Sequence, residues 1–132
     1  MDKNRRDFTL AGAAFALTAV LPAIAAPMKA KPMYGLIGQM LCIAAKRDAL
    51  IAILTRASAA MPGCLSYIVA ADLARDDAIW ITEVWDSKES HMASLKLPAV
   101  QAAIAEGRPM IAGFGSRFET APVGGTGLPT AA

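Results

Sequence analysis

The segment from Met33 to Ile43 restricts the fold more than any other part of the chain, because it is apolar on both of its alternating sets of side chains. Gln39 is its one polar side chain. This pattern is typical of a strand whose sheet is buried on both faces. Any fold of the chain must therefore supply an apolar layer above and below this strand.

Two helices are predicted after this strand. The stretch from Lys46 to Met61 has apolar residues at helical spacing, and Pro62-Gly63 ends it. The sequence Asp86-Ser87-Lys88-Glu89 is a capping box with Asp86 at the N-cap, so a second helix begins there. A proline inside this helix, Pro98, is expected to break it into two segments, Ser87–Lys96 and Ala99–Glu106.

Three further strands complete the pattern, each rich in β-branched, apolar or aromatic residues between turn-forming segments. They are expected over Leu65–Ala71, Ala78–Trp85 and Gly115–Ala121. The order β-α-β-β-α-β defines an α+β protein of the ferredoxin-like class. Two helices cover only one face of a four-stranded sheet. The strand Ala78–Trp85 has Ile79, Ile81 and Trp85 on one face and Trp80 and Val84 on the other, so the uncovered face is apolar in either case. Such an apolar face predicts a homodimer in which two sheets face each other.

Residues 1–25 have the features of an export signal of the twin-arginine type. Arg5-Arg6 and Phe8 resemble the Arg-Arg-x-Phe pattern, and the uncharged run that follows ends in Ala23-Ile24-Ala25, which suits a signal peptidase. The alternative is an uncleaved membrane anchor, and Pro22 argues against it. We therefore expect a periplasmic or otherwise exported protein that is not stably inserted in the membrane after cleavage. Its parts are a linker (26–32), a domain (33–122) and an extended tail (123–132).

Composition excludes several classes of function. Removal of residues 1–25 leaves ten basic and nine acidic residues, a net charge of +1. No basic patch alternates with aromatic residues, so a nucleic-acid partner is not expected. The chain has one histidine and no Cys-x-x-Cys pair, which argues against a metal site. Cys42 and Cys64 lie in apolar stretches where cysteine commonly packs as a small hydrophobe, although export would permit a disulfide.

Three short motifs occur in order along the predicted elements: Pro62-Gly63-Cys64, Glu83-Val84-Trp85-Asp86 and His91-Met92-Ala93-Ser94. This set resembles the antibiotic biosynthesis monooxygenase (ABM) domain family over about residues 33–122. The resemblance implies a dimeric α+β barrel. For one branch of the family it also implies oxidation of quinol-like or polyphenolic aromatics with O₂, with no metal or flavin cofactor.

The resemblance gives six residues candidate roles. A phenolate can pass an electron to O₂ itself, so the protein has to hold the ring, favour the deprotonated form and exclude water. A histidine can accept a proton near neutral pH, and a buried glutamate with a raised pKa is an alternative base. Tryptophan offers a stacking surface, and tyrosine and glutamine offer hydrogen bonds. The candidate catalytic residues are His91 and Glu83, and the candidate substrate-binding residues are Gln39, Tyr67, Trp80 and Trp85.

Each candidate also has a structural interpretation. Trp80 and Trp85 lie on a strand, where aromatic residues are common for packing alone. Glu83 could form a structural ion pair with Arg117 or Arg56. A single helical histidine is often merely solvated.

Two other functions remain open on the sequence. A haem-degrading branch of the family uses an Asn, a Trp and a His. Trp85 matches the Trp, but Gln39 falls at the Asn position and Ile104 at the His position, which leaves no axial ligand for the iron. The third hypothesis is a non-catalytic dimeric module that binds a small apolar ligand in the same pocket.

Overall fold

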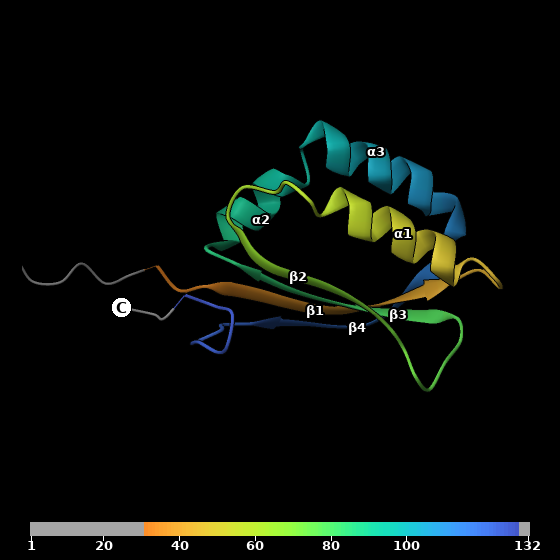
Figure 1. Ribbon diagram of the computed structural model, residues 1–132, viewed down its shortest axis with the longest axis horizontal. Helices are drawn as coiled ribbons and strands as arrows, with labels where there is room; N and C mark the ends of the chain where they lie inside the picture. The colour runs from red at the N-terminus through yellow and green to blue at the C-terminus, as the bar shows by residue number, and fades with distance from the viewer. Residues whose placement is uncertain (1–30, 130–132) are drawn as a thin grey trace, which may run out of the picture.

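A computed structural model describes residues 31–129, and in this part of the chain four strands and three α-helices form two layers (Figure 1). The elements are β1 (Tyr34–Cys42), α1 (Arg47–Ala57), β2 (Cys64–Ala71), β3 (Ala78–Trp85), α2 (Lys88–Ser94), α3 (Pro98–Gly107), the 3₁₀ helix η1 (Arg108–Met110) and β4 (Ile111–Thr120). The ferredoxin-like α+β class is confirmed. None of these helices is long and apolar enough to cross a membrane. The predicted export signal lies outside the described residues.

The sheet has the strand order β2-β3-β1-β4, and every pair of neighbours is antiparallel. The strand β1 lies in its interior, and its register with β3 pairs Tyr34 with Trp85 and Met40 with Ile79. The three helices lie over one face of the sheet, and no helix of the described chain covers the other face (Figure 1). This arrangement agrees with the one-sided helical layer expected from the sequence.

The core lies between α1 and the middle of the sheet. Leu50, Ile79 and Cys42 are each at least 97% buried, and each buried aliphatic side chain stabilises the fold by about 1.5–3 kcal/mol. The helix α3 packs mainly against α1, and they approach closely at Gly107, where an added Cβ would lie 2.9 Å from Cδ1 of Leu50. The helical layer therefore rests on the sheet chiefly through α1.

A β-bulge interrupts the pairing of β1 with β4. Gly38 pairs with Arg117 and Met40 pairs with Phe114, so β4 advances three residues where β1 advances two. Side chains three residues apart on a regular strand point to opposite faces, whereas an extra residue brings them to the same face. Phe114 and Arg117 therefore both belong to the face of the sheet that the helices cover.

Two element boundaries differ from the sequence prediction by four residues. The strand β4 begins at Ile111 rather than at Gly115, because Ile111 pairs with Cys42 despite the glycines that follow it. The helix α1 ends at Ala57, four residues early, and the chain then turns before Pro62. Cross-strand pairing, which a local pattern does not report, decides the first of these boundaries.

The N-cap of α2 is Ser87 rather than the predicted Asp86. The Ser87 hydroxyl accepts a hydrogen bond from the backbone N–H of Ser90 at 3.1 Å. The backbone N–H of Asp86 instead donates to the carbonyl oxygen of Gly63 at 2.9 Å, so Asp86 still belongs to the end of the strand pairing. The helix therefore starts one residue later than the capping-box pattern indicates.

Both cysteines are free thiols in this structure. Cys42 is buried in the core, as expected of a cysteine that packs as a small hydrophobe. Cys64 is half-buried at the start of β2, and its thiol lies 3.5 Å from the carbonyl oxygen of Ser66. The two residues occupy opposite ends of the sheet, as the register of β1 and β2 with β3 shows.

We predict that Gly63→Ala destabilises the protein by about 1–3 kcal/mol, because the residue has φ +83°, where a side chain is strained. An added Cβ would also lie 2.6 Å from the Ser90 side chain and 2.8 Å from the Asp86 carboxylate. Thermal unfolding measures the effect. Gly38→Ala is the matched control, since an added Cβ there meets nothing within 4 Å. Equal melting temperatures for the two variants would contradict the prediction.

Candidate active site

A cavity of about 710 Å³ lies between the helical layer and the sheet. This volume is within the range of small-molecule sites in proteins. Its lining is mostly aliphatic and aromatic and comes from α1, α2, α3 and all four strands. Only four ionisable residues are among the lining residues: Tyr67, Glu83, His91 and Arg108.

Strand pairing and one helix turn bring the polar lining residues together. Tyr67 on β2 pairs directly with Glu83 on β3. Trp85 lies two residues further along β3, on the same face, by the alternation of side chains. His91 enters from α2, whose start is fixed by the Ser87 cap. The structure therefore assembles four of the six predicted site residues around one end of the cavity.

The Glu83 carboxylate is held on two sides. The indole N–H of Trp85 donates a hydrogen bond to Oε2 of Glu83 at 2.8 Å. Nε2 of His91 lies 3.7 Å from the same oxygen, which makes an ion pair when the imidazole is protonated. Burial raises the pKa of the Glu83 carboxyl, and the Trp85 hydrogen bond, His91 and the charge of Arg117 partly oppose that rise. Glu83 therefore holds a proton more readily than an exposed glutamate does.

His91 is enclosed by aromatic rings. The residue is only 7% exposed. The centroid of its ring lies 5.4 Å from that of the Tyr34 ring and 5.5 Å from that of the Trp85 ring. Nδ1 of His91 is buried and has no hydrogen-bond partner within residues 31–129. A buried polar atom without a partner costs about 1–3 kcal/mol, and functional sites are where such costs persist. This nitrogen is the one buried side-chain N or O atom of residues 31–129 that lacks a hydrogen-bond partner, and it belongs to a residue that lines the cavity.

Tyr67, the cross-strand partner of Glu83, supplies a hydroxyl to the cavity lining. Burial raises the pKa of the Tyr67 phenol, and the charge of the neighbouring Glu83 raises it further. The phenol therefore stays protonated and can donate a hydrogen bond within the cavity.

Tyr34 is a residue that the sequence analysis did not select. Its hydroxyl donates to Oε1 of Glu119 at 2.7 Å, and Nζ of Lys88 lies 3.1 Å from the same oxygen. The Lys88 ammonium also lies 5.5 Å from the centroid of the Tyr34 ring. Tyr34 thus joins this cluster to His91, and none of the three residues lines the cavity. Tyr34 can be assigned to this region only from the register of β1 with β3, which pairs it with Trp85.

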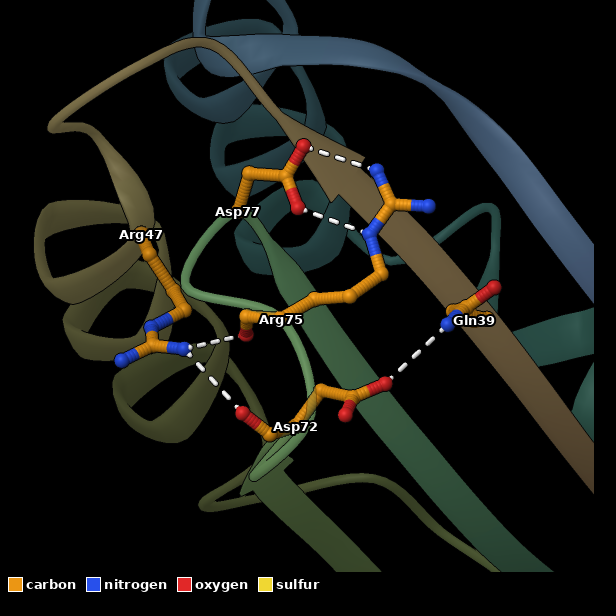
Figure 2. A network of polar contacts seen from close by, with 5 residues as sticks. All are labelled: Gln39, Arg47, Asp72, Arg75 and Asp77. Carbon is orange, nitrogen blue, oxygen red and sulfur yellow. Dashed lines mark hydrogen bonds and ion pairs between the residues drawn. The ribbon is translucent and has the colours of Figure 1, made fainter.

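Gln39 and Trp80, the other two predicted substrate-binding residues, lie on the opposite face of the sheet. They are cross-strand partners, and neither lines the cavity. Nε2 of Gln39 and the indole N–H of Trp80 both donate to Oδ2 of Asp72, at 3.1 and 2.8 Å. Figure 2 shows Gln39 reaching Asp72 in the loop between β2 and β3. In this structure the two side chains fix that loop.

The same loop is held from the helical side by Arg47 (Figure 2). Its guanidinium donates to the carbonyl oxygens of Asp72 and Arg75, at 3.3 and 2.8 Å. Arg75 in turn forms a two-point ion pair with Asp77, with both contacts at 2.8 Å. These contacts give the loop a defined shape far from the His91 end of the cavity.

The structural ion pair considered for Glu83 does not form with either arginine. Arg56 pairs instead with Glu106, at 2.7 Å. Arg117 makes no ion pair within residues 31–129, and its charge acts on Glu83 only at longer range. The strong partners of Glu83 are therefore Trp85 and His91, both of which line the cavity.

Comparison with known proteins gives the family. The family model described as antibiotic biosynthesis monooxygenase matches residues 33–106. The chain belongs to this family. A crystal structure from Chloroflexus aurantiacus J-10-fl, whose name proposes an antibiotic biosynthesis monooxygenase, is 63% identical with a TM-score of 0.71. That alignment covers 74% of this chain and 99% of the other, which confirms the resemblance found in the sequence motifs.

More distant ABM structures share the fold. One from Caulobacter crescentus CB15, named in the same way, is 19% identical with a TM-score of 0.65, and the match covers 73% of this chain and 94% of the other. One from Deinococcus radiodurans is 25% identical with a TM-score of 0.56, covering 67% and 91%. Among curated proteins, none matches the chain. The family and the names of these neighbours support a monooxygenase-like role in general.

We predict that Trp85→Phe raises the pKa of Glu83 further. The indole hydrogen bond stabilises the carboxylate, so its loss favours the protonated acid. Carbon-detected NMR titration of the glutamate carboxyl groups measures the pKa. Trp80→Phe is the control, because Trp80 makes the same kind of bond to Asp72 on the other face of the sheet. A Glu83 pKa that is unchanged or lower in Trp85→Phe would contradict the prediction.

Proposed function

We propose that the protein is a cofactor-independent monooxygenase that oxidises quinol-like or polyphenolic aromatics with O₂ in this cavity. The observation that carries the proposal is the buried, unpartnered Nδ1 of His91 beside an apolar cavity, with Glu83 on the other side of the same ring. A phenolic hydroxyl supplies the missing hydrogen bond once the imidazole turns Nδ1 toward the cavity, and its ring suits the apolar lining.

The first step is removal of a proton from the bound phenol. His91 accepts the proton, and the carboxylate of Glu83, 3.7 Å from Nε2, stabilises the imidazolium that results. The attraction between these charges is stronger in an apolar cavity than in water. Tyr67, which stays protonated, can donate a hydrogen bond to a developing oxyanion.

The electron-rich phenolate then supplies the reducing electrons. One electron passes to O₂, and the resulting superoxide and ring radical combine to form a carbon–oxygen bond. Loss of water completes the reaction, so a benzenediol and O₂ give a hydroxyquinone and one water. The substrate is oxidised by four electrons, and O₂ accepts all four. The role of the protein in these steps is to hold the ring and to keep water away from the intermediates.

We predict that His91→Gln lowers quinol-dependent O₂ uptake by about 10²–10⁴-fold, the usual contribution of general base catalysis. An oxygen electrode and a panel of quinols, with the spontaneous rate subtracted, measure the effect. Met92→Gln is the control, because Met92 is exposed on the same helix and does not line the cavity. An unchanged rate in His91→Gln would remove His91 from the mechanism. Quinol binding without any uptake would instead favour the non-catalytic binding module.

We also propose that the protein is a homodimer joined through the sheet face opposite the helices. Ile68 and Phe118 lie on that face and are 54% and 57% exposed, beside Ile37 and Val84. An apolar face of this kind in a single protomer is typical of an interface. Its position on the far side of the sheet leaves the cavity of each protomer intact.

We predict that Phe118→Asp dissociates this dimer, because it places a charge within an apolar contact. Multi-angle light scattering on the purified domain measures the mass. Met92→Asp is the control, since Met92 is exposed on the helical side. A monomeric wild-type protein at micromolar concentration would refute the dimer.

A further inference from the structure

The ionisable residues that line the cavity divide into two groups. Tyr67, Glu83 and His91 form the polar cluster described above, and Arg108 lies apart from them in the 3₁₀ helix η1. We propose that Arg108 is an anion subsite, so that the preferred substrates are aromatic phenols with a carboxylate at the end opposite the reacting hydroxyl. The identity of the reacting end rests on the proposed function.

Strand register shows that the two groups occupy different ends of the cavity. Glu83 pairs with Leu36 near the start of β1. Arg108 is next to the segment that closes the other end, where the Met110 carbonyl accepts a hydrogen bond from the backbone N–H of Ile43 at 2.9 Å. Six residues of strand separate Leu36 from Cys42, which is roughly 20 Å. A ligand that contacts both groups must therefore be elongated.

The guanidinium of Arg108 has no protein counter-charge in the described part of the chain. The carboxylate nearest in sequence, Glu106, is already paired with Arg56 at 2.7 Å. Arg47 and Arg75 are also occupied, by carbonyl oxygens and by Asp77. Among the residues that line the cavity, the only carboxylate is Glu83, at the far end. The cavity therefore combines the unpaired positive charge of Arg108 with a mostly apolar lining.

A structural explanation also exists for a cation at this position. Arg108 is the C-cap residue of α3, and the negative end of a helix dipole favours a positive charge there. That explanation predicts an effect on stability and none on the choice of ligand. Measuring ligand preference therefore distinguishes this structural explanation from an anion subsite.

The surroundings of Arg108 indicate how strong the preference should be. Ile104 and Phe114 line the cavity and are 37% and 72% exposed, so they offer apolar surface to a ring near the opening. Arg108 is itself exposed, and salt screens a pair at such a position. We therefore expect a charge-assisted contact of moderate strength that weakens as ionic strength rises.

The test measures binding of three naphthalene ligands by isothermal titration calorimetry, under nitrogen and at low salt. In 6-hydroxy-2-naphthoate the hydroxyl and carboxylate lie at opposite ends of the rings, in 3-hydroxy-2-naphthoate they are adjacent, and 2-naphthol lacks the carboxylate. The wild-type protein should bind 6-hydroxy-2-naphthoate about tenfold more tightly than either of the other two. Added salt should reduce that ratio.

Arg108→Gln should bring the ratio of the 6-hydroxy-2-naphthoate and 2-naphthol affinities close to one. Lys96→Gln should retain the wild-type ratio, because Lys96 is exposed, does not line the cavity and makes no ion pair in the described part of the chain. Using the ratio corrects for any general loss of binding in the variant. No binding of 6-hydroxy-2-naphthoate to the wild type, an equal affinity for the two ligands, or an unchanged ratio in Arg108→Gln would each overturn the proposal. Since no O₂ is present, the result is independent of whether the protein is an oxygenase.

Discussion

The antiparallel pairing of β1 with β3 is the constraint on which the rest of the structure depends. It joins the two most buried strands, so that Met40 and Ile79 lie under α1 while Tyr34 and Trp85 lie near α2. One face of this pair thus supplies the core at one end and the candidate active site at the other. A shift of one residue in register would exchange the faces and move Glu83 or its neighbours out of the cavity.

The strength of this pairing explains what could be predicted from the sequence. The strand Ala78–Trp85 was predicted at its observed boundaries, and the alternation within it places Glu83 and Trp85 on one face and Trp80 on the other. The family resemblance carried by the short motifs then gave His91 its candidate role. Information contained in a single strand or in one helix turn was therefore sufficient for these residues.

Residues whose role depends on two strands together were not predictable in this way. Tyr34 looked like one apolar residue among many, and its place beside His91 follows only from its pairing with Trp85. Gln39 looked suited to a ligand because it is the one polar residue of an apolar strand, yet the register pairs it with Trp80 above the Asp72 loop. The bulge that turns Arg117 toward the helical face is likewise a property of the β1–β4 pair.

The proposed chemistry depends on how the cavity distributes charge. Burial raises the pKa of both Glu83 and Tyr67, so this end of the cavity opposes negative charge. A phenolate formed beside the Glu83 carboxylate is therefore tolerable only if the proton stays nearby, and an imidazolium at His91 between them meets that need. Burial also opposes a second negative charge on the substrate at this end, where the charge of Arg117 acts only at longer range. At the distant Arg108 that second charge meets an unpaired cation. Coulomb attraction thus favours His91 as the base at one end of the cavity and an acidic substituent of the substrate at the other.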